Sequence, residues 1–333
     1  MSIIDRPASE APIRPTAAVS LPGIQVAGNE LRLFDSSMPL IEAMAEDIRN
    51  AKSRVWMESY IIADDAAGRA IGEALVDRAA AGLDVRLMYD AIGSLNTPQA
   101  NFDRLTAAGV QVHAFHSIRA NLWRFPFLDV LNRRNHRKLL VIDDRLAYFG
   151  GMNIVDQRGI VTPADAKLHH LPASAGWRDL HARLTGPKQA EIAAEFERLW
   201  DWKHLGRAAR RTPWPIKEML SDERQEAIYC FASRPLRKTR RVARVFVPLI
   251  RRARREIIAS MAYFIPIGPV LRELLRARRR GVRVRVVVPG DSDVQAVHWA
   301  TRHLCKRLLA HGIQIYERRQ FMLHSKVMVI DDE

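Results

Sequence analysis

The chain of 333 residues is long enough for two ordinary domains, and 48% of its residues are hydrophobic, which excludes an intrinsically disordered protein. Its formal net charge of +15 indicates polyanionic partners, either nucleic acid, an anionic membrane or a phosphate-bearing substrate. Cys230 and Cys305, the only cysteines, show no metal-ligand spacing and are typical of packed thiols in a reducing compartment.

The first 26 residues predict a flexible segment, because they are rich in Pro, Ala and Ser and lack the apolar stretch of a signal peptide. No apolar run in the sequence approaches the ~18–20 residues that a membrane-spanning helix needs. If the protein works at a membrane, we expect it to work from the surface.

The rest of the chain predicts helices that alternate with short strands, in an order that occurs twice. Gly82 and Gly281 follow matching helices, where glycine commonly ends a helix. We therefore predict an α/β fold of two duplicated lobes, each a mostly parallel sheet flanked by helices. The matching segments are 38–64 with 242–266, 72–90 with 271–291, and 105–115 with 308–318.

We expect four regions along the chain, and the second lobe among them to be incomplete. In the register of the two copies, Glu333 aligns with Arg145, whereas the first copy continues to Trp202. A truncated second lobe would lose a strand and leave the chain poorly stable or inactive. The expected regions are a flexible segment at 1–26, a first lobe at 27–202, a linker at 203–226 and a second lobe at 227–333.

Two segments favour an anionic surface as the partner. Residues 117–135 mix Trp and Phe with Arg, which is typical either of a membrane-interface segment or of a loop that caps the core. Residues 234–256 are the most basic stretch, and each basic residue near anionic lipid gains ~1 kcal/mol.

The strongest functional signal is a repeated motif, His-x-Lys-x-x-x-x-Asp, in HRKLLVIDD (136–144) and HSKVMVIDD (324–332). Alternate residues of a strand share a face, so we predict that His136 and Lys138 point the same way. An ammonium and an imidazole side by side suit a phosphate group. The catalytic candidates are therefore His136, Lys138, Asp143, His324, Lys326 and Asp331.

The two aspartates of the motifs stand at odd parity to the histidines. On a straight strand Asp143 faces away from His136, and Asp331 faces away from His324. We therefore expect both aspartates to anchor the structure, unless a bulge intervenes.

Three residues beyond the first motif complete the predicted site. Gly151 has no side chain, so backbone can approach a ligand there, and the Asn153 amide can hydrogen-bond a phosphoryl oxygen. Asp179 can hold one imidazole nitrogen and fix its tautomer.

This set of residues predicts two-step phosphoryl transfer. One histidine attacks phosphorus and forms a phosphohistidine, while the other protonates the leaving oxygen and then deprotonates the incoming alcohol or water. The two lysines stabilise the charge on the phosphoryl oxygens. The scheme needs no metal or cofactor, and the near-identical motifs leave open which histidine attacks.

These motifs, with the turn FGGMN and the segment GWRDLHARLTGP, resemble the phospholipase D superfamily, and the chain from about residue 28 onward resembles short bacterial cardiolipin synthases without N-terminal membrane helices. The resemblance implies transfer of a phosphatidyl group onto phosphatidylglycerol, which gives cardiolipin and releases glycerol or another head group. It implies that His136 is the nucleophile and His324 the acid and base. It also implies a peripheral enzyme on the cytoplasmic face of the bacterial inner membrane, with an anionic phospholipid membrane as partner and no obligate protein partner.

Two alternatives stay open. A phospholipase D-type phosphodiesterase could use the same motif to hydrolyse phospholipid or nucleic acid, because fold and motif do not fix the substrate. A non-catalytic anion-binding scaffold would not need intact His and Lys in both copies. The aromatic residues of 117–135 favour lipid over nucleic acid.

Overall fold

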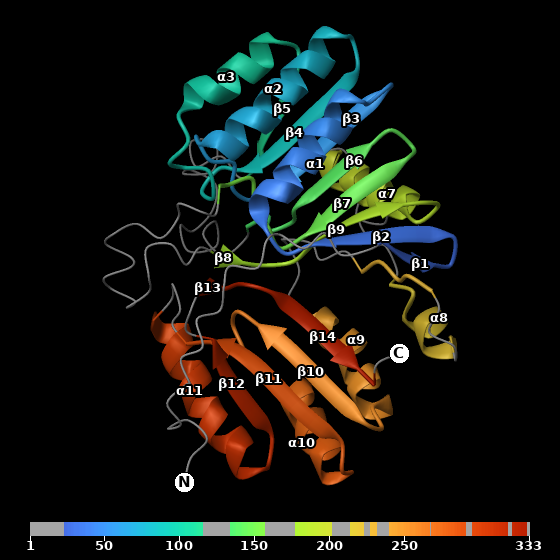
Figure 1. The fold of residues 1–333 in the computed structure, drawn as a ribbon, viewed down its shortest axis with the longest axis vertical. Helices are drawn as coiled ribbons and strands as arrows, with labels where there is room; N and C mark the ends of the chain where they lie inside the picture. Colours follow the sequence, from blue (N-terminus) through green and yellow to red (C-terminus); the bar gives the residue numbers. More distant parts are fainter. Residues whose placement is uncertain are drawn as a thin grey trace.

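The computed structural model describes residues 23–115, 134–156, 177–201, 214–222, 227–231, 240–266, 268–290, 295–318 and 322–331. Figure 1 shows two lobes, with the amino-terminal half above and the carboxy-terminal half below. The expectations for residues 1–22, for the aromatic segment up to residue 133 and for most of the linker lie outside the described residues. None of the described helices has the length and apolar character to cross a bilayer.

The first lobe is an eight-stranded sheet in the order β1-β2-β9-β7-β6-β3-β4-β5. Its elements are β1 (Ile24–Val26), β2 (Asn29–Phe34), α1 (Ser37–Arg49), β3 (Arg54–Ser59), α2 (Ala66–Ala80), β4 (Asp84–Asp90), α3 (Gln99–Ala107), β5 (Gln111–Phe115), β6 (Leu139–Ile142), β7 (Leu146–Gly150), β9 (His181–Thr185) and α7 (Gln189–Trp200).

The second lobe is a four-stranded sheet in the order β12-β11-β10-β14. A short helix, α8 (Ile216–Ser221), precedes it. Its elements are α9 (Arg240–Arg252), β10 (Glu256–Met261), α10 (Pro269–Arg279), β11 (Arg283–Pro289), α11 (Gln295–Ala310), β12 (Gln314–Arg318) and β14 (Lys326–Ile330).

The predicted duplication is confirmed, because α1-β3-α2-β4-α3-β5-β6 in the first lobe matches α9-β10-α10-β11-α11-β12-β14 in the second. Gly82 and Gly281 both take a positive φ, at 83° and 94°, where the matching helices end. That left-handed conformation costs glycine nothing and is the usual way to end a helix.

The predicted mostly parallel sheet holds for the second lobe and is wrong for the first. In the second lobe β10-β11 and β11-β12 are parallel and β10-β14 is antiparallel. In the first lobe only β3-β4 and β4-β5 are parallel, and the other five neighbouring pairs are antiparallel. Strands joined by a helix run parallel, whereas the short turn from Ile142 to Leu146 turns the chain back on itself.

The sheet of the first lobe is buried on both faces, and β3 shows how. Val55 and Met57 belong to the core that contains the apolar side chains of α1 and α2. Trp56 belongs to the core under α7, where its ring stacks on Phe196 at 5.5 Å. Neighbouring residues of a strand point to opposite faces, so the side chains of RVWMES pack into both cores. The second lobe has a core of its own between its sheet and helices.

A two-stranded parallel sheet joins the lobes. β8 (Trp177–Arg178) pairs with β13 (Met322–Leu323), so Met322 lies opposite Trp177 and Leu323 opposite Arg178. Figure 1 shows both strands between the two large sheets. Asp179 directly follows β8, and His324 directly follows β13, so this pairing brings residues from opposite ends of the chain together.

Candidate active site

His136 and Lys138 lie directly before β6, which begins at Leu139, so the prediction that they sit on a strand is wrong. The ladder with β3 starts at Glu58 and Leu139, and the preceding Asn135 donates its backbone N–H to Asp90 instead, at 3.0 Å. Both motif side chains nevertheless approach one aromatic ring. His136 stacks on Tyr60 with ring centroids 4.1 Å apart, and Lys138 Nζ lies 5.3 Å from the same centroid.

The surroundings weaken the proton affinity of both first-lobe groups. Burial, followed by the charge of Lys138, lowers the pKa of His136, and the charge of Lys326 from the second motif acts in the same direction. Burial lowers the pKa of Lys138 to about 8, again with help from Lys326. Desolvation and like charges both disfavour a protonated base. The charge of Lys326 in the second motif therefore acts on both groups of the first motif.

His324 lies in the break between β13 and β14, and Lys326 is the first residue of β14. The backbone N–H of His324 donates to the carbonyl of Arg178 at 2.8 Å, and this bond extends the β8–β13 ladder by one. The imidazole lies between two aromatic rings, with Trp177 at 5.2 Å and Tyr263 at 6.0 Å between centroids. The second motif is therefore fixed by both lobes.

Asp179 connects the two halves of the site. Its carboxylate is only 3% exposed, and its Oδ2 lies 2.6 Å from His324 Nδ1 and 3.9 Å from Lys326 Nζ. Because Nδ1 donates to Asp179, Nε2 is the ring nitrogen left to give or take a proton, and it lies 3.2 Å from Lys326 Nζ. The first lobe thus supplies the carboxylate that orients the second-lobe imidazole.

Gly151 makes room for Asp179. A Cβ at this position would lie 2.2 Å from Asp179 Oδ1, so any other residue would displace the carboxylate. The Gly151 N–H donates to the carbonyl of Leu180 at 2.8 Å. The residue that closely approaches Gly151 is therefore Asp179, and the Gly151 N–H is paired within the protein.

Asn153 also makes a structural contact. Its Oδ1 accepts the backbone N–H of Ile61 at 3.2 Å. The same loop is held at its end by Asp65, which accepts from the N–H of Asp156 at 2.7 Å and from Gly68 at the start of α2. The loop after β7 is thereby fixed beside the strand end that carries Tyr60.

The two motif aspartates are anchors and lie outside the group of reacting side chains. Asp143 has a φ of 52° in the turn after β6, and it accepts hydrogen bonds from the N–H groups of Lys52, Ser53 and Arg54 at 2.8–3.2 Å. Burial alone would raise the pKa of Asp143, but these hydrogen bonds outweigh it and leave that pKa lowered.

Asp331 repeats this arrangement in the second lobe. It has a φ of 64° and accepts from the N–H groups of Arg254, Arg255 and Glu256 at 2.7–2.8 Å. Its pKa is also lowered, since backbone hydrogen bonds outweigh burial. The eight-residue motif therefore couples a His-Lys pair to an anchor that fixes the start of β3 in the first lobe and of β10 in the second.

Sequence reasoning missed several buried polar residues beside the first motif. Glu58 is 1% exposed, accepts a hydrogen bond from Asn135 and pairs with Arg137 at 3.2 Å. Burial raises the pKa of Glu58, despite the opposing charge of Arg137. A carboxylate inside an apolar strand was the signal available in the sequence, because Glu is almost never fully buried unless paired. Tyr60 carried no such signal.

The described segments contain no group of three or more His, Cys, Asp or Glu side chains that could hold a metal ion.

A family profile described as "Cardiolipin synthase, PLD-like domain" matches residues 44–166 and 246–333, which include both motifs and more than half of the chain. The chain belongs to this phospholipase D-like family. The two matched segments also contain six of the seven matching elements in each lobe, from β3 to β6 in the first and from β10 to β14 in the second.

Curated members of the family resemble the chain over most of its length. Cardiolipin synthase 2 of Bacillus anthracis is 30% identical over 306 residues, which cover 91% of this chain and 56% of that protein. Cardiolipin synthase A of Pseudomonas fluorescens is 33% identical over 311 residues, which cover 92% of this chain and 60% of that protein. The chain thus spans well under two thirds of the length of these relatives.

The fold also has a solved counterpart. The crystal structure of phosphatidylserine synthase from Haemophilus influenzae superimposes with a TM-score of 0.59 at 14% identity, over 93% of this chain and 77% of that one. At this identity the likeness shows the fold alone. Both motif-bearing lobes are therefore part of a known two-lobed architecture.

Proposed function

We propose that the chain transfers a phosphatidyl group from one phospholipid onto phosphatidylglycerol, producing cardiolipin and releasing glycerol or another head group. The observation that carries this proposal is the contact across the junction in which Asp179 of the first lobe holds His324 of the second motif at 2.6 Å. Membership of the cardiolipin synthase, PLD-like family supports the choice of phospholipid as substrate.

His136 is the proposed nucleophile. The lowered pKa of His136 keeps its imidazole neutral at neutral pH, and a neutral imidazole has the lone pair that attacks phosphorus. Its attack forms a P–N bond and breaks the P–O bond to the first head group. The product of this step is a phosphatidyl-histidine on the first lobe and a free alkoxide that needs a proton.

His324 is the proposed acid and base. It gives its Nε2 proton to the leaving alkoxide in the first step. In the second step it takes the proton of the incoming phosphatidylglycerol hydroxyl, whose oxygen attacks phosphorus and breaks the P–N bond. Asp179 holds the ring in one tautomer through Nδ1 and stabilises its positive charge during each transfer.

The two lysines are the proposed binders of the phosphoryl oxygens. Lys138 approaches from the first lobe and Lys326 from the second, so each lobe contributes one cation to the same phosphate. The amide of Asn153 and the backbone at Gly151 remain proposed contributors to phosphate binding. We propose no metal or cofactor in either step.

We further propose that the protein binds the anionic membrane from its surface, on the cytoplasmic face of the bacterial inner membrane. The net charge of +15 and the basic ends of α9 support this placement. We propose residues 27–202 and 227–333 as the two functional lobes, with 203–226 as the linker between them.

Product analysis tests the proposed reaction. The protein is incubated with phosphatidylglycerol vesicles, and mass spectrometry measures cardiolipin and free glycerol. We expect both products from the unaltered chain, and neither above background from His136→Ala or His324→Ala. In the His324→Ala variant, the expected product of an activated substrate is a phosphatidyl group trapped on His136.

Two outcomes would change the conclusion. Phosphatidic acid in place of cardiolipin would make water the acceptor and the protein a phospholipase. Unchanged lipid together with cleavage of single-stranded DNA by a folded protein would move the substrate class to nucleic acid.

A further inference from the structure

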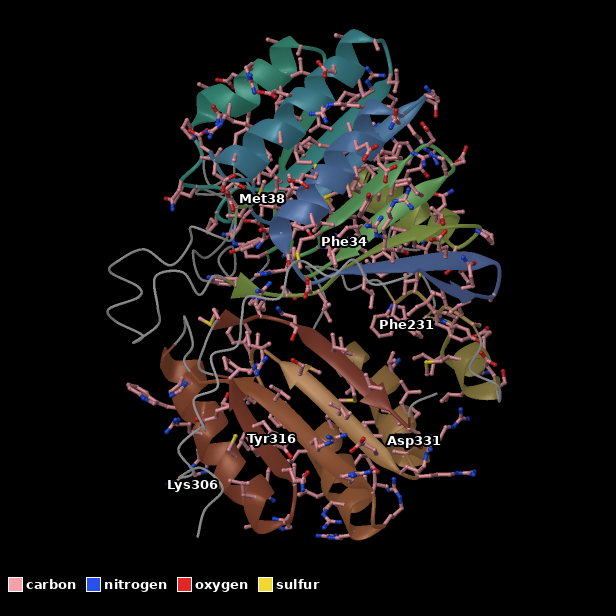
Figure 2. The ribbon with its side chains drawn as sticks, viewed as in Figure 1. Phe34, Met38, Phe231, Lys306, Tyr316 and Asp331 are labelled. Atoms are coloured by element: carbon pink, nitrogen blue, oxygen red, sulfur yellow. The ribbon has the colours of Figure 1, made fainter. Side chains whose placement is uncertain are left out.

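A pocket of about 530 Å³ lies between the lobes and reaches the first motif. On one side it is bounded by Lys138, Leu139 and the end of β7, and on the other by α9 of the second lobe. Phe231, which lines the pocket, is labelled in Figure 2 between the two lobes. The volume of the pocket falls within the ~300–1,000 Å³ of typical ligand pockets.

The lining of the pocket is mainly hydrocarbon and aromatic. From α7 and β7 it receives Ile192 and Phe149, and from α9 it receives Val242, Val245 and Phe246. The segment between the lobes adds further apolar side chains, namely Trp214, Ile228, Tyr229, Cys230 and Phe231. Burial raises the pKa of the Cys230 thiol to about 11, as expected in surroundings of low polarity.

The charged residues at the pocket have partners within the protein. Arg137 pairs with Glu58 at 3.2 Å, Glu191 pairs with Lys188 at 2.6 Å, and Glu195 pairs with Arg198 at 2.5 Å. The motif lysine, Lys138, is also among the lining residues, so the pocket borders the first motif. The pocket therefore adjoins the proposed phosphate-binding motif, and most of the rest of its wall is apolar.

This distribution matches a molecule with an anionic phosphate at one end and a hydrocarbon chain at the other. A nucleic acid would need cations along the length of its backbone, whereas here the wall beyond Lys138 is apolar. A soluble phosphate ester would need polar partners for its hydroxyl groups, which this wall does not provide.

We propose that the pocket receives an acyl chain of the phospholipid whose phosphate lies between the two motifs. The inference rests on the proposed function and adds to it a binding site for the lipid tail. Because the pocket has walls from both lobes, the acyl chain would contact α7 and α9 together. The length and bulk of the chain would then affect turnover, independently of the head group.

Substitution of Val245 by Trp tests this site. The larger ring would fill part of the pocket without altering a motif residue. The substrates are dioleoyl phosphatidylglycerol in mixed micelles and bis(p-nitrophenyl) phosphate, a soluble diester without an acyl chain. We expect Val245→Trp to lower kcat/KM for the lipid by about tenfold or more, since excluding two methylene groups loses that much binding. For the soluble diester we expect a change within about twofold.

Ile24→Trp is the matched control, because Ile24 is 51% exposed on β1, away from the pocket, and receives the same ring. We expect Ile24→Trp to leave kcat/KM unchanged for both substrates. If Val245→Trp does not fold, as judged by its thermal unfolding, Val242→Trp replaces it, since Val242 is 38% exposed at the pocket and tolerates a larger side chain.

The outcomes separate the two proposals. Equal kcat/KM for the lipid in the folded Val245→Trp variant and the unaltered protein would overturn the acyl site and leave the proposed function standing. An equal loss on both substrates would also overturn it, because the effect would not depend on the acyl chain. Turnover of the soluble diester with no lipid product from the unaltered protein would overturn the phospholipid function itself.

Discussion

The two lobes use one motif in different surroundings. At the position where the first lobe has the buried pair Glu58 and Arg137, the second lobe has Ser260 and Ser325, whose hydroxyl oxygens lie 2.6 Å apart. The sheet registers establish the match, because Glu58 pairs with Leu139 as Ser260 pairs with Val327. The anchors are kept in both copies, while the groups around the reacting histidines have diverged.

The divergence gives the two histidines different partners. His136 stacks on Tyr60, and among the described residues no carboxylate hydrogen-bonds its ring. His324 takes its carboxylate from the other lobe. A neutral ring with a free lone pair suits attack, whereas a ring held by a carboxylate suits proton transfer. The difference teaches that duplicated motifs can acquire separate roles through their neighbours.

Of the substitutions that test this comparison, Asp179→Asn should lower kcat the most, because it removes the carboxylate that distinguishes His324 from His136. Without the carboxylate, His324 loses its orientation and its stabilised charge, so we expect kcat to fall by about 10³-fold, or ~4 kcal/mol. The measurement is kcat on phosphatidylglycerol and on a diester with a p-nitrophenyl leaving group, which needs little protonation. We expect a smaller loss in the first step with the activated diester.

A merely structural role for Asp179 would lower both rates equally. That result would contradict the assignment of Asp179 to the acid-base histidine.

Substitution of the two anchors, Asp143 and Asp331, should destabilise the two lobes in the same way. Asp143→Ala removes the acceptor for three backbone N–H groups and places alanine at a φ of 52°, so we expect a loss of about 2 kcal/mol in the free energy of unfolding. Asp143→Asn keeps an acceptor and tolerates this backbone, so it should lose less. Asp331→Ala and Asp331→Asn should follow the same order in urea unfolding. Equal stability of the Ala and Asn variants would contradict the anchor role.

The anchors also predict an acid limit to stability. The folded-state pKa values of Asp143 and Asp331 are lowered, so their contribution is present above the ordinary aspartate pKa and is lost as pH falls through the folded values. The Asp143→Ala variant should therefore differ least from the unaltered protein in strong acid.

The pH dependence of kcat/KM should distinguish Lys138 from Lys326. Its pKa of about 8 means that it loses its charge as pH rises through that value, so kcat/KM should fall about tenfold for each pH unit above it. In Lys138→Arg the guanidinium stays charged, and the alkaline decline should move to higher pH. Lys326→Arg is the control and should leave the decline near pH 8. An unmoved decline in Lys138→Arg would assign it to another group.

Substitution of Tyr60 should lower kcat/KM the least. The position after the corresponding strand in the second lobe is Ala262, which has no ring to stack on a histidine. Tyr60→Leu loses a stacked pair worth ~0.5–1.5 kcal/mol, so we expect kcat/KM to fall by about fivefold. Tyr60→Phe keeps the ring and should stay close to the unaltered protein. A loss in Tyr60→Phe as large as in Tyr60→Leu would assign the effect to the hydroxyl.

Much of the fold could be predicted because the duplication repeats helices and strands of ordinary length with glycine at matching ends. The fixed spacing of the motifs also identifies both His-Lys pairs, whose catalytic role stays a proposal. The junction could not be predicted, since β8 and β13 have two residues each and such short strands carry no periodic pattern. The antiparallel pairing of β6 with β7 depends on the turn at Asp143, whose positive φ the motif spacing does not reveal. The sequence predicts that Asp179 holds an imidazole, but the identity of that histidine, His324, has no local signal because the two residues belong to different lobes.

The junction between the lobes has a thermodynamic consequence. Each lobe has its own apolar core, but β8 and β13 pair through only two residue positions. Separation of the lobes would remove Asp179 from His324 while both cores stayed intact, and it should cost less than unfolding either core. Heating should therefore abolish turnover before helix content falls, and a wider gap between these two temperatures would indicate docking that is weaker relative to the cores.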